Sequence, residues 1–194
     1  MFDVIQYPHP VLKEKSSVIE TIDNDIINQA KNMVDAMYKD SGIGLAANQV
    51  AIANRLFVMD VPDGVWRYDG EKKGVLKIEA GYRSGERAED IQANPKIVIN
   101  PEIVKKSEAR SVYEEGCLSL PGHYAEVVRP AKITARYRTL NGETVEEEFE
   151  GLDSHCFQHE LDHLDGVLFI DHISALKRNM IVKRMKKAAK GATL

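Results

Sequence analysis

Apolar residues recur at helical spacing after Thr21 and form one face of a predicted helix that ends near Asp40. This face consists of Ile26, Ile27, Ala30, Met33, Val34, Met37 and Tyr38. Thr21 or Asp23 would cap the start of the helix, because both side chains can accept hydrogen bonds from free backbone amides. A short segment with two glycines follows, and residues 55–59 then form a predicted strand that stops at Pro62.

The second half of the chain alternates apolar and polar residues as strands do. Residues 96–100 form one predicted strand, and residues 133–137 form another. The inward positions of the latter are Ile133, Ala135 and Tyr137. Asn141-Gly142 is typical of a tight hairpin turn, after which residues 144–149 form the next strand. The predicted sheet is therefore largely antiparallel.

Helical spacing returns twice near the C-terminal end. Gly151 starts one predicted helix with Asp153 or Ser154 as its cap, and Gly166 is placed to end it. A second repeat spans residues 173–185 and would pack an apolar face onto the body of the protein. That face consists of Ile173, Leu176, Met180, Ile181 and Met185.

Length and composition set the scale of the molecule. With 194 residues and 43% hydrophobic content, the chain has the size of a single catalytic domain, residues 1–194, with one core. The N-terminus lacks a signal-peptide pattern, and no apolar run reaches membrane-spanning length, so we expect a cytoplasmic location without membrane contact. Residues 62–92 contain five glycines among mixed charges and are predicted to form a mobile insertion.

The formal net charge of −4 is unevenly distributed. Residues 174–194 carry seven basic residues and no acidic one, which leaves 19 basic against 30 acidic residues elsewhere. The seven are Lys177, Arg178, Lys183, Arg184, Lys186, Lys187 and Lys190. A basic C-terminal helix on an acidic body indicates either an anionic partner, such as an assembly that contains nucleic acid, or simply a solvated helix face.

His159 and His163 carry the clearest chemical signal in the chain. Side chains four residues apart project from the same face of a helix, close enough to bind one metal ion. Glu160 follows the first histidine, where a carboxylate can take a proton from water held by the metal. The pattern favours a hydrolase, although a surface helix with solvated histidines has the same spacing.

The identity of the third metal ligand distinguishes between classes of metal hydrolase. A zinc peptidase of the metzincin type needs another histidine where Phe169 stands, and Gly166 alone fits that pattern. Cys117 lies in a segment flanked by glycine after a predicted strand, where a thiolate could complete a Cys-His-His set. Three protein ligands leave one position for water, whereas a non-catalytic metal-binding module would fill the fourth position.

Three motifs together resemble one known family, peptide deformylase. They are Gly42-Ile43-Gly44-Leu45-Ala46-Ala47-Asn48-Gln49, Glu115-Gly116-Cys117-Leu118-Ser119 and Gln158-His159-Glu160-Leu161-Asp162-His163. The resemblance covers about residues 1–170. It implies an α+β fold with antiparallel β-sheets packed around a central metal-binding helix, with an additional C-terminal helix. It also implies removal of the formyl group from the N-terminal formylmethionine of newly synthesised proteins.

The resemblance also implies roles for individual residues. Glu160 would be the general base, while the Gln49 side-chain amide and the Leu118 backbone N–H would stabilise the charge on the formyl oxygen. The metal ligands would be Cys117, His159 and His163. Iron(II) is the ion that the family favours, and Zn²⁺, Ni²⁺ or Co²⁺ can occupy such a site. A deformylase-like protein without activity is disfavoured, because all of these residues are present.

Substrate contacts follow the same resemblance. The backbone of Ile43, Gly44 and Leu45 would pair with an extended formylmethionyl peptide as an added strand. An apolar methionine pocket would be lined by Ile43, Leu118, His155, Cys156 and His159, with Tyr124 at the rim of the cleft. His155 departs from the family, which usually has an aliphatic residue there. Either its ring lies flat against the pocket wall, or the pocket tolerates a more polar side chain, or His155 is an exposed histidine in the first turn of the helix. The basic C-terminal helix would then contact ribosomal RNA, where nascent chains emerge.

Overall fold

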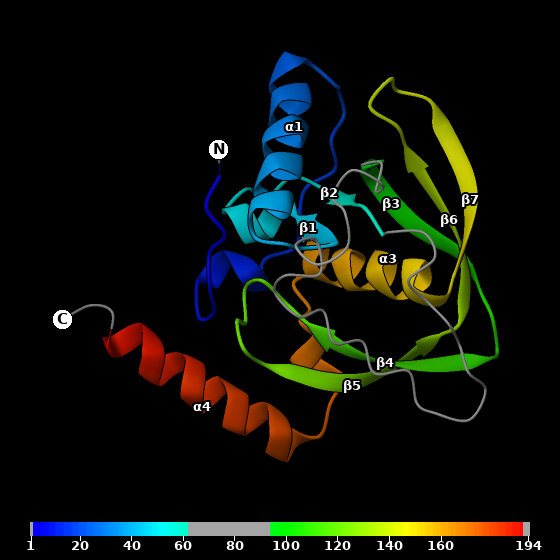
Figure 1. Ribbon diagram of the computed structural model, residues 1–194. Helices are drawn as coiled ribbons and strands as arrows, with labels where there is room; N and C mark the ends of the chain where they lie inside the picture. Colours follow the sequence, from blue (N-terminus) through cyan, green and yellow to red (C-terminus); the bar gives the residue numbers. More distant parts are fainter. Residues whose placement is uncertain (1, 62–93, 192–194) are drawn as a thin grey trace, which may run out of the picture.

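The computed structural model describes residues 2–61 and 94–191, and the predicted insertion at 62–92 therefore lies outside the described residues (Figure 1). The longer elements are α1 (Asn24–Lys39), β1 (Gly44–Ala46), β2 (Leu56–Met59), β3 (Lys96–Lys106), β4 (Arg110–Gly116), β5 (Tyr124–Pro130), β6 (Lys132–Arg138), β7 (Thr144–Glu150), α3 (Gly151–Leu164) and α4 (Ala175–Gly191). Short 3₁₀ helices are η1 (Pro10–Lys13), η2 (Ala47–Val50) and η3 (Phe169–Asp171).

The first helix confirms the predicted one at residues 21–40. Asp23 caps α1, and its carboxylate accepts hydrogen bonds from the backbone amides of Asp25 and Ile26, each at 3.0 Å. Ala30, Met33 and other residues of the predicted apolar face are buried against β1 and β2. Burial of this face positions the loop that leads to β1.

Two antiparallel sheets make up the strand content of the described residues. The larger has the order β1-β2-β3-β6-β7, and the smaller pairs β4 with β5. Ile133, Ala135 and Tyr137 are buried on β6, and the turn at Asn141 and Gly142 joins it to β7, as predicted. The expected α+β architecture is confirmed.

Helix α3 lies between the two sheets (Figure 1). The sequence prediction of its cap was wrong: Glu150 is the N-cap residue without a capping side chain, and Asp153 and Ser154 lie inside the first turn. The Ser154 hydroxyl instead donates to the Pro130 carbonyl at 3.2 Å, because the buried helix start packs on the end of β5. Gly166 follows the helix with a φ of +73°, in the left-handed conformation expected after a C-terminal cap.

Helix α4 packs less of its apolar face than predicted. Met185 is buried, and Ile173 and Ile181 are partly buried against the core around η3. Leu176 and Met180, however, are 74% and 50% exposed, because only one side of the helix meets the body. Among residues 2–61 and 94–191, no helix is both long enough and apolar enough to cross a membrane.

Candidate metal centre

Cys117, His159 and His163 converge in the structure, and the spacing of the two histidines predicted their common face. The two histidines lie one turn apart on α3, and Cys117 enters from the loop after β4. The ligand atoms of all three lie within 4.8 Å of one another, and the Cys117 sulfur is 3.2 Å from Nε2 of His163. Both histidines are buried. One thiolate and two imidazoles within this distance could hold a divalent transition-metal ion.

The hydrogen bonds of the histidines are compatible with metal binding. Nδ1 of His159 lies 2.9 Å from the Glu115 carboxylate, which leaves its Nε2 free to face the site. The buried Nδ1 of His163 has no hydrogen-bond partner among the described residues. The donor set and its geometry therefore fit a metal ion with three protein ligands.

Glu115 and Arg129 form a buried ion pair behind His159. Arg129 donates from Nε and Nη2 to the two carboxylate oxygens, at 2.6 and 2.9 Å, and from Nη1 to Asp162 at 2.7 Å. Burial alone would raise the pKa of the Glu115 carboxyl, but hydrogen bonds from Arg129, His155 and His159 hold it well below its usual range. Glu115 is therefore an ionised acceptor that fixes the ring of His159.

Sequence reasoning gave Glu115 and Arg129 no role, although a signal for them existed. Ala125, Val127 and Arg129 alternate toward the interior on β5. An arginine on an inward-facing position requires a buried carboxylate partner, because an unpaired buried charge is very costly.

Glu160 lies beside the three ligands and is 4% exposed. Burial raises the pKa of its carboxyl to about 7. Its Oε2 has no hydrogen-bond partner among the described residues, and its Cδ and Cγ lie 2.8 and 2.9 Å from the place where a Cβ on Gly44 would stand. The carboxylate is therefore held against the Gly44 backbone with one oxygen available for proton transfer.

Gln49 reaches the site from η2. Its Oε1 accepts the Ala46 backbone amide at 2.8 Å, which fixes the orientation of the side-chain amide. Its Nε2 consequently lies 3.4 Å from the Cys117 sulfur and 3.3 Å from the Ser119 hydroxyl. A donor so close to the ligands can reach a charge that develops at the metal position.

The N-terminal segment joins the two loops that carry these groups, which the sequence did not suggest. The Ile5 amide donates to the Gln49 carbonyl at 2.8 Å, and the Tyr7 amide donates to the Ser119 carbonyl at 2.9 Å. Val4 and Gln6, which alternate with these residues, line the same cavity as the metal ligands.

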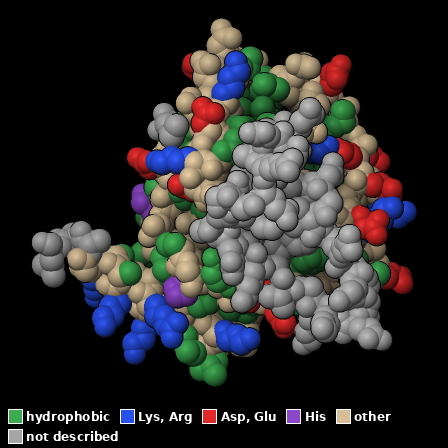
Figure 2. All heavy atoms as spheres, in the orientation of Figure 1, with side chains coloured by type: hydrophobic (Ala, Val, Ile, Leu, Met, Phe, Trp, Pro, Cys, Tyr) green, Lys and Arg blue, Asp and Glu red, His purple; other side chains and the backbone are tan. Residues whose placement is uncertain are grey.

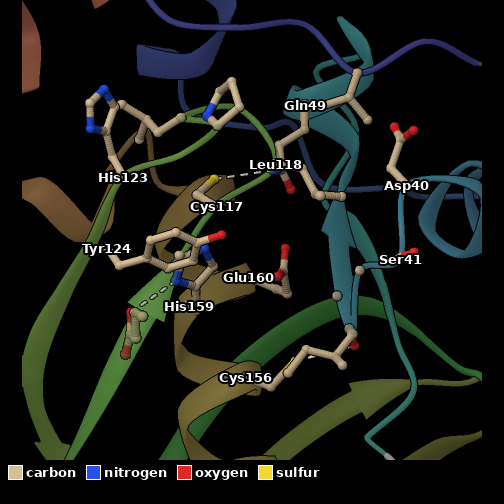
Figure 3. A pocket seen from close by; sticks show the side chains of 18 of the residues that line it. Asp40, Ser41, Gln49, Cys117, Leu118, His123, Tyr124, Cys156, His159 and Glu160 are labelled. Atoms are coloured by element: carbon tan, nitrogen blue, oxygen red, sulfur yellow. Dashed lines mark hydrogen bonds and ion pairs between the residues drawn. The ribbon is translucent and has the colours of Figure 1, made fainter. Parts of the chain in front are cut away.

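A cavity of about 430 Å³ opens beside the ligands, and Cys117, His159 and Glu160 point into it (Figure 3). Of the predicted substrate contacts it is lined by Ile43, Gly44, Leu118, Tyr124, His155 and Cys156. Tyr124 is 54% exposed at its rim. Leu45 does not line the cavity, since its side chain is fully buried in the core, and only its backbone in edge strand β1 is suited to strand pairing.

His155 is a buried residue of the cavity wall, 1% exposed. Its Nδ1 lies 3.2 Å from Glu115 and its Nε2 lies 2.9 Å from the Ser111 hydroxyl. The alternative of an exposed histidine in the first turn is therefore wrong. Because both ring nitrogens have protein partners, the ring can offer the cavity only carbon atoms.

The chain is similar to known proteins both in sequence and in fold. The sequence profile of the family described as polypeptide deformylase matches residues 1–179. The peptide deformylase of Rhizobium meliloti (strain 1021) is 47% identical over 187 residues, 96% of this chain and 93% of that protein. The peptide deformylase of Novosphingobium aromaticivorans is 44% identical over 191 residues, 98% of each chain.

Solved structures of similar proteins cover the chain as completely. The crystal structure of peptide deformylase from Ehrlichia chaffeensis has a TM-score of 0.81 at 30% identity, with 100% of this chain and 99% of that chain covered. The crystal structure of the enzyme from Thermotoga maritima has a TM-score of 0.72 at 37% identity, with 90% and 98% covered. The similarity therefore includes the fold, the order of the elements and the length of the chain.

Proposed function

Because this chain belongs to the peptide deformylase family, it is a metal-dependent hydrolase, and we propose that Cys117, His159 and His163 hold its ion. The enzyme removes the N-formyl group from newly synthesised polypeptides and releases formate. One observation carries the site assignment: three ligand atoms within 4.8 Å of one another, beside a buried carboxylate with an unpartnered oxygen.

The ion is proposed to be iron(II), with Zn²⁺, Ni²⁺ or Co²⁺ as substitutes. A thiolate with two imidazoles accommodates each of these by ligand type. When bound, such an ion supplies Lewis acidity, which lowers the pKa of water and polarises the formyl carbonyl. Protein prepared without oxygen and loaded with Fe²⁺ should exceed the Zn²⁺ form in turnover; equal rates would remove the preference for iron.

Glu160 is proposed to move the proton. Its Oε2 would accept a proton from the attacking water as the new carbon–oxygen bond forms, and would return it to the departing amine as the carbon–nitrogen bond breaks. A carboxyl with a pKa raised to about 7 is well matched to both steps near neutral pH.

Gln49 and Leu118 are proposed to stabilise the negative charge on the former formyl oxygen. The Gln49 amide already points Nε2 toward the ligands, held there by the Ala46 amide. The Leu118 backbone N–H follows directly on Cys117 in the same loop and would be the second donor.

The substrate is proposed to lie along edge strand β1 with its first side chain in the cavity. Backbone pairing with residues 43–45 gives affinity that does not depend on side chains beyond the first. Ile43 and Cys156 give that cavity an apolar lining suited to methionine.

A formate-release assay on a formyl-Met peptide tests this function, with the unformylated peptide as control. The parent protein should release one formate per peptide, and Glu160→Gln should retain the metal while turnover falls by at least about a hundredfold. Absence of formate release by the metal-loaded parent would contradict the function, and full activity of Glu160→Gln would contradict the role of the base.

Ribosome contact through α4 is a second proposal. Lys183 and Lys187 are exposed, and the basic residues of this helix extend along one end of the molecule (Figure 2). Replacing both with Glu should weaken binding to ribosomes in a salt-dependent manner without changing turnover of a short peptide. The matched control is the pair Lys105→Glu and Lys106→Glu, two exposed lysines of β3 in the larger sheet. Ribosome binding that is unchanged by the α4 pair would contradict the proposal.

A further inference from the structure

His155 connects a strand of the smaller sheet to the support of a metal ligand. It is fully enclosed between α3 and β4, with the Tyr113 ring centroid 4.4 Å from its own. Its Nε2 contacts the Ser111 hydroxyl at 2.9 Å, and its Nδ1 contacts Oε1 of Glu115 at 3.2 Å. Glu115 in turn contacts His159 through Oε2 at 2.9 Å.

The ring of His155 has a hydrogen-bonding partner on each side. The Glu115 carboxylate accepts hydrogen bonds from Arg129 at both oxygens, and it faces Nδ1 of His155 as a further acceptor. On the other side of the ring, Nε2 contacts the Ser111 hydroxyl, which can both donate and accept. His155 is thus held in one orientation by a partner at each ring nitrogen.

The Glu115 carboxylate has two donors on each oxygen. Oε1 accepts from His155 and from Nε of Arg129, and Oε2 accepts from His159 and from Nη2 of Arg129. Arg129 also donates from Nη1 to Asp162 at 2.7 Å, so its guanidinium is shared between two carboxylates. His155 precedes His159 by one turn of α3, and its contact with Oε1 leaves Oε2 facing His159.

We propose that His155 is a positioning residue that orients Glu115 so that Nδ1 of His159 faces this carboxylate and Nε2 of His159 faces the metal position. The inference rests on the proposed function, since it needs His159 to be a ligand. It assigns the unusual histidine of the cavity wall to metal affinity and not to substrate choice, because neither ring nitrogen is available to a substrate.

Two substitutions separate the two hydrogen bonds of His155. In His155→Asn the side-chain amide lies near the position of Nδ1 and can keep the hydrogen bond to Glu115. In His155→Gln the side-chain amide lies near the position of Nε2 and can keep only the hydrogen bond to Ser111. The measurement is the dissociation constant for Co²⁺, obtained by competition with a chelator, together with the melting temperature of the metal-free protein. His155→Gln should weaken Co²⁺ binding on the order of tenfold, whereas His155→Asn should stay within about threefold of the parent.

A role limited to filling the cavity wall predicts something else: equal Co²⁺ affinities in the two variants, or losses that follow the fall in melting temperature. Either result would overturn the inference. Should both variants fail to fold, Ser111→Ala removes only the partner of Nε2 and should weaken Co²⁺ binding by about threefold. Unchanged affinity in that variant would overturn the inference as well.

The parent protein and Cys117→Ser distinguish failure of this inference from failure of the proposed site. The parent should bind one Co²⁺ with a thiolate charge-transfer band, which Cys117→Ser should lose. Absence of that band in the parent would overturn the metal site itself, and the role of His155 with it. A normal band combined with unaffected His155 variants would overturn the role of His155 alone.

Discussion

Gly44 shows how tightly single residues are placed around Glu160. A Cβ at this position would stand 2.8 Å from Cδ and 2.9 Å from Cγ of the Glu160 side chain. Real Cβ atoms do not approach so closely, so either the carboxylate or the strand must move. The lack of a side chain at residue 44 therefore serves the proposed base as well as the proposed strand pairing.

Gly44→Ala should lower kcat on the order of a hundredfold, because the displaced carboxylate no longer meets the attacking water. Metal content, measured by atomic absorption, should be unchanged. In the double variant with Glu160→Gln the two losses should not add, since both act through one group. Additive losses would show that Gly44→Ala acts elsewhere, for example on substrate binding alone.

Gln49→Leu should reduce kcat by about a hundredfold to a thousandfold through loss of one donor to the developing charge. It also leaves the buried Ala46 amide without its acceptor, which should cost about 1–3 kcal/mol of stability. Ser119→Ala is the control, because it removes another partner of the Gln49 amide but no donor to the substrate. Near-normal turnover of Gln49→Leu would exclude this residue from the mechanism.

At the scale of elements, helix geometry explains what the sequence could predict. The four-residue spacing of His159 and His163 determines their common face, and the alternation on β6 determines its buried side. The cap of α3 was mispredicted because Ser154 bonds to β5, a partner that is remote in sequence. Local rules identify an element, and tertiary contacts then determine its ends.

The N-terminal segment is an element whose role depends entirely on such remote contacts. A chain that begins at Pro8 behind a new start methionine loses both the Ile5 bond to Gln49 and the Tyr7 bond to Ser119. We expect kcat to fall between about tenfold and a hundredfold, because the two loops with the proposed oxyanion donors are no longer joined.

A chain that begins at Val4 is the matched control, since it retains both hydrogen bonds. Formate release and Co²⁺ affinity should be measured for both chains. Equal kcat in the two would contradict the role of the segment, and equal loss of Co²⁺ binding and activity in the longer truncation would indicate a general loss of fold.

At the scale of the whole molecule, the site forms where three separate regions of the chain meet. The spacing of His159 and His163 predicted a metal site, and Cys117 was a candidate third ligand from its glycine-flanked segment, whereas residues 42–49 were assigned to this site only through the family resemblance. Ser111, Arg129 and His155 could not be joined by sequence reasoning, because they come together through the packing of α3 on the β4-β5 sheet. The periodicity of apolar residues describes one element at a time and does not predict contacts between elements.

Metal binding should stabilise the whole fold, since the ligands come from α3 and from the loop after β4. At an ion concentration of about 100 times Kd, binding contributes about 2.7 kcal/mol, which corresponds to a melting temperature about 5–10 °C higher. Calorimetry with and without a chelator measures this difference. His163→Ala should abolish the chelator effect, and an equal effect in that variant would place the metal elsewhere.

The most direct test of the account is X-ray absorption at the metal edge of the Zn²⁺-loaded protein. The account predicts one sulfur at about 2.3 Å and two imidazole nitrogens at about 2.0–2.1 Å, with the remaining position taken by solvent oxygen. A first shell without sulfur, or with a fourth protein ligand in place of solvent, would contradict it.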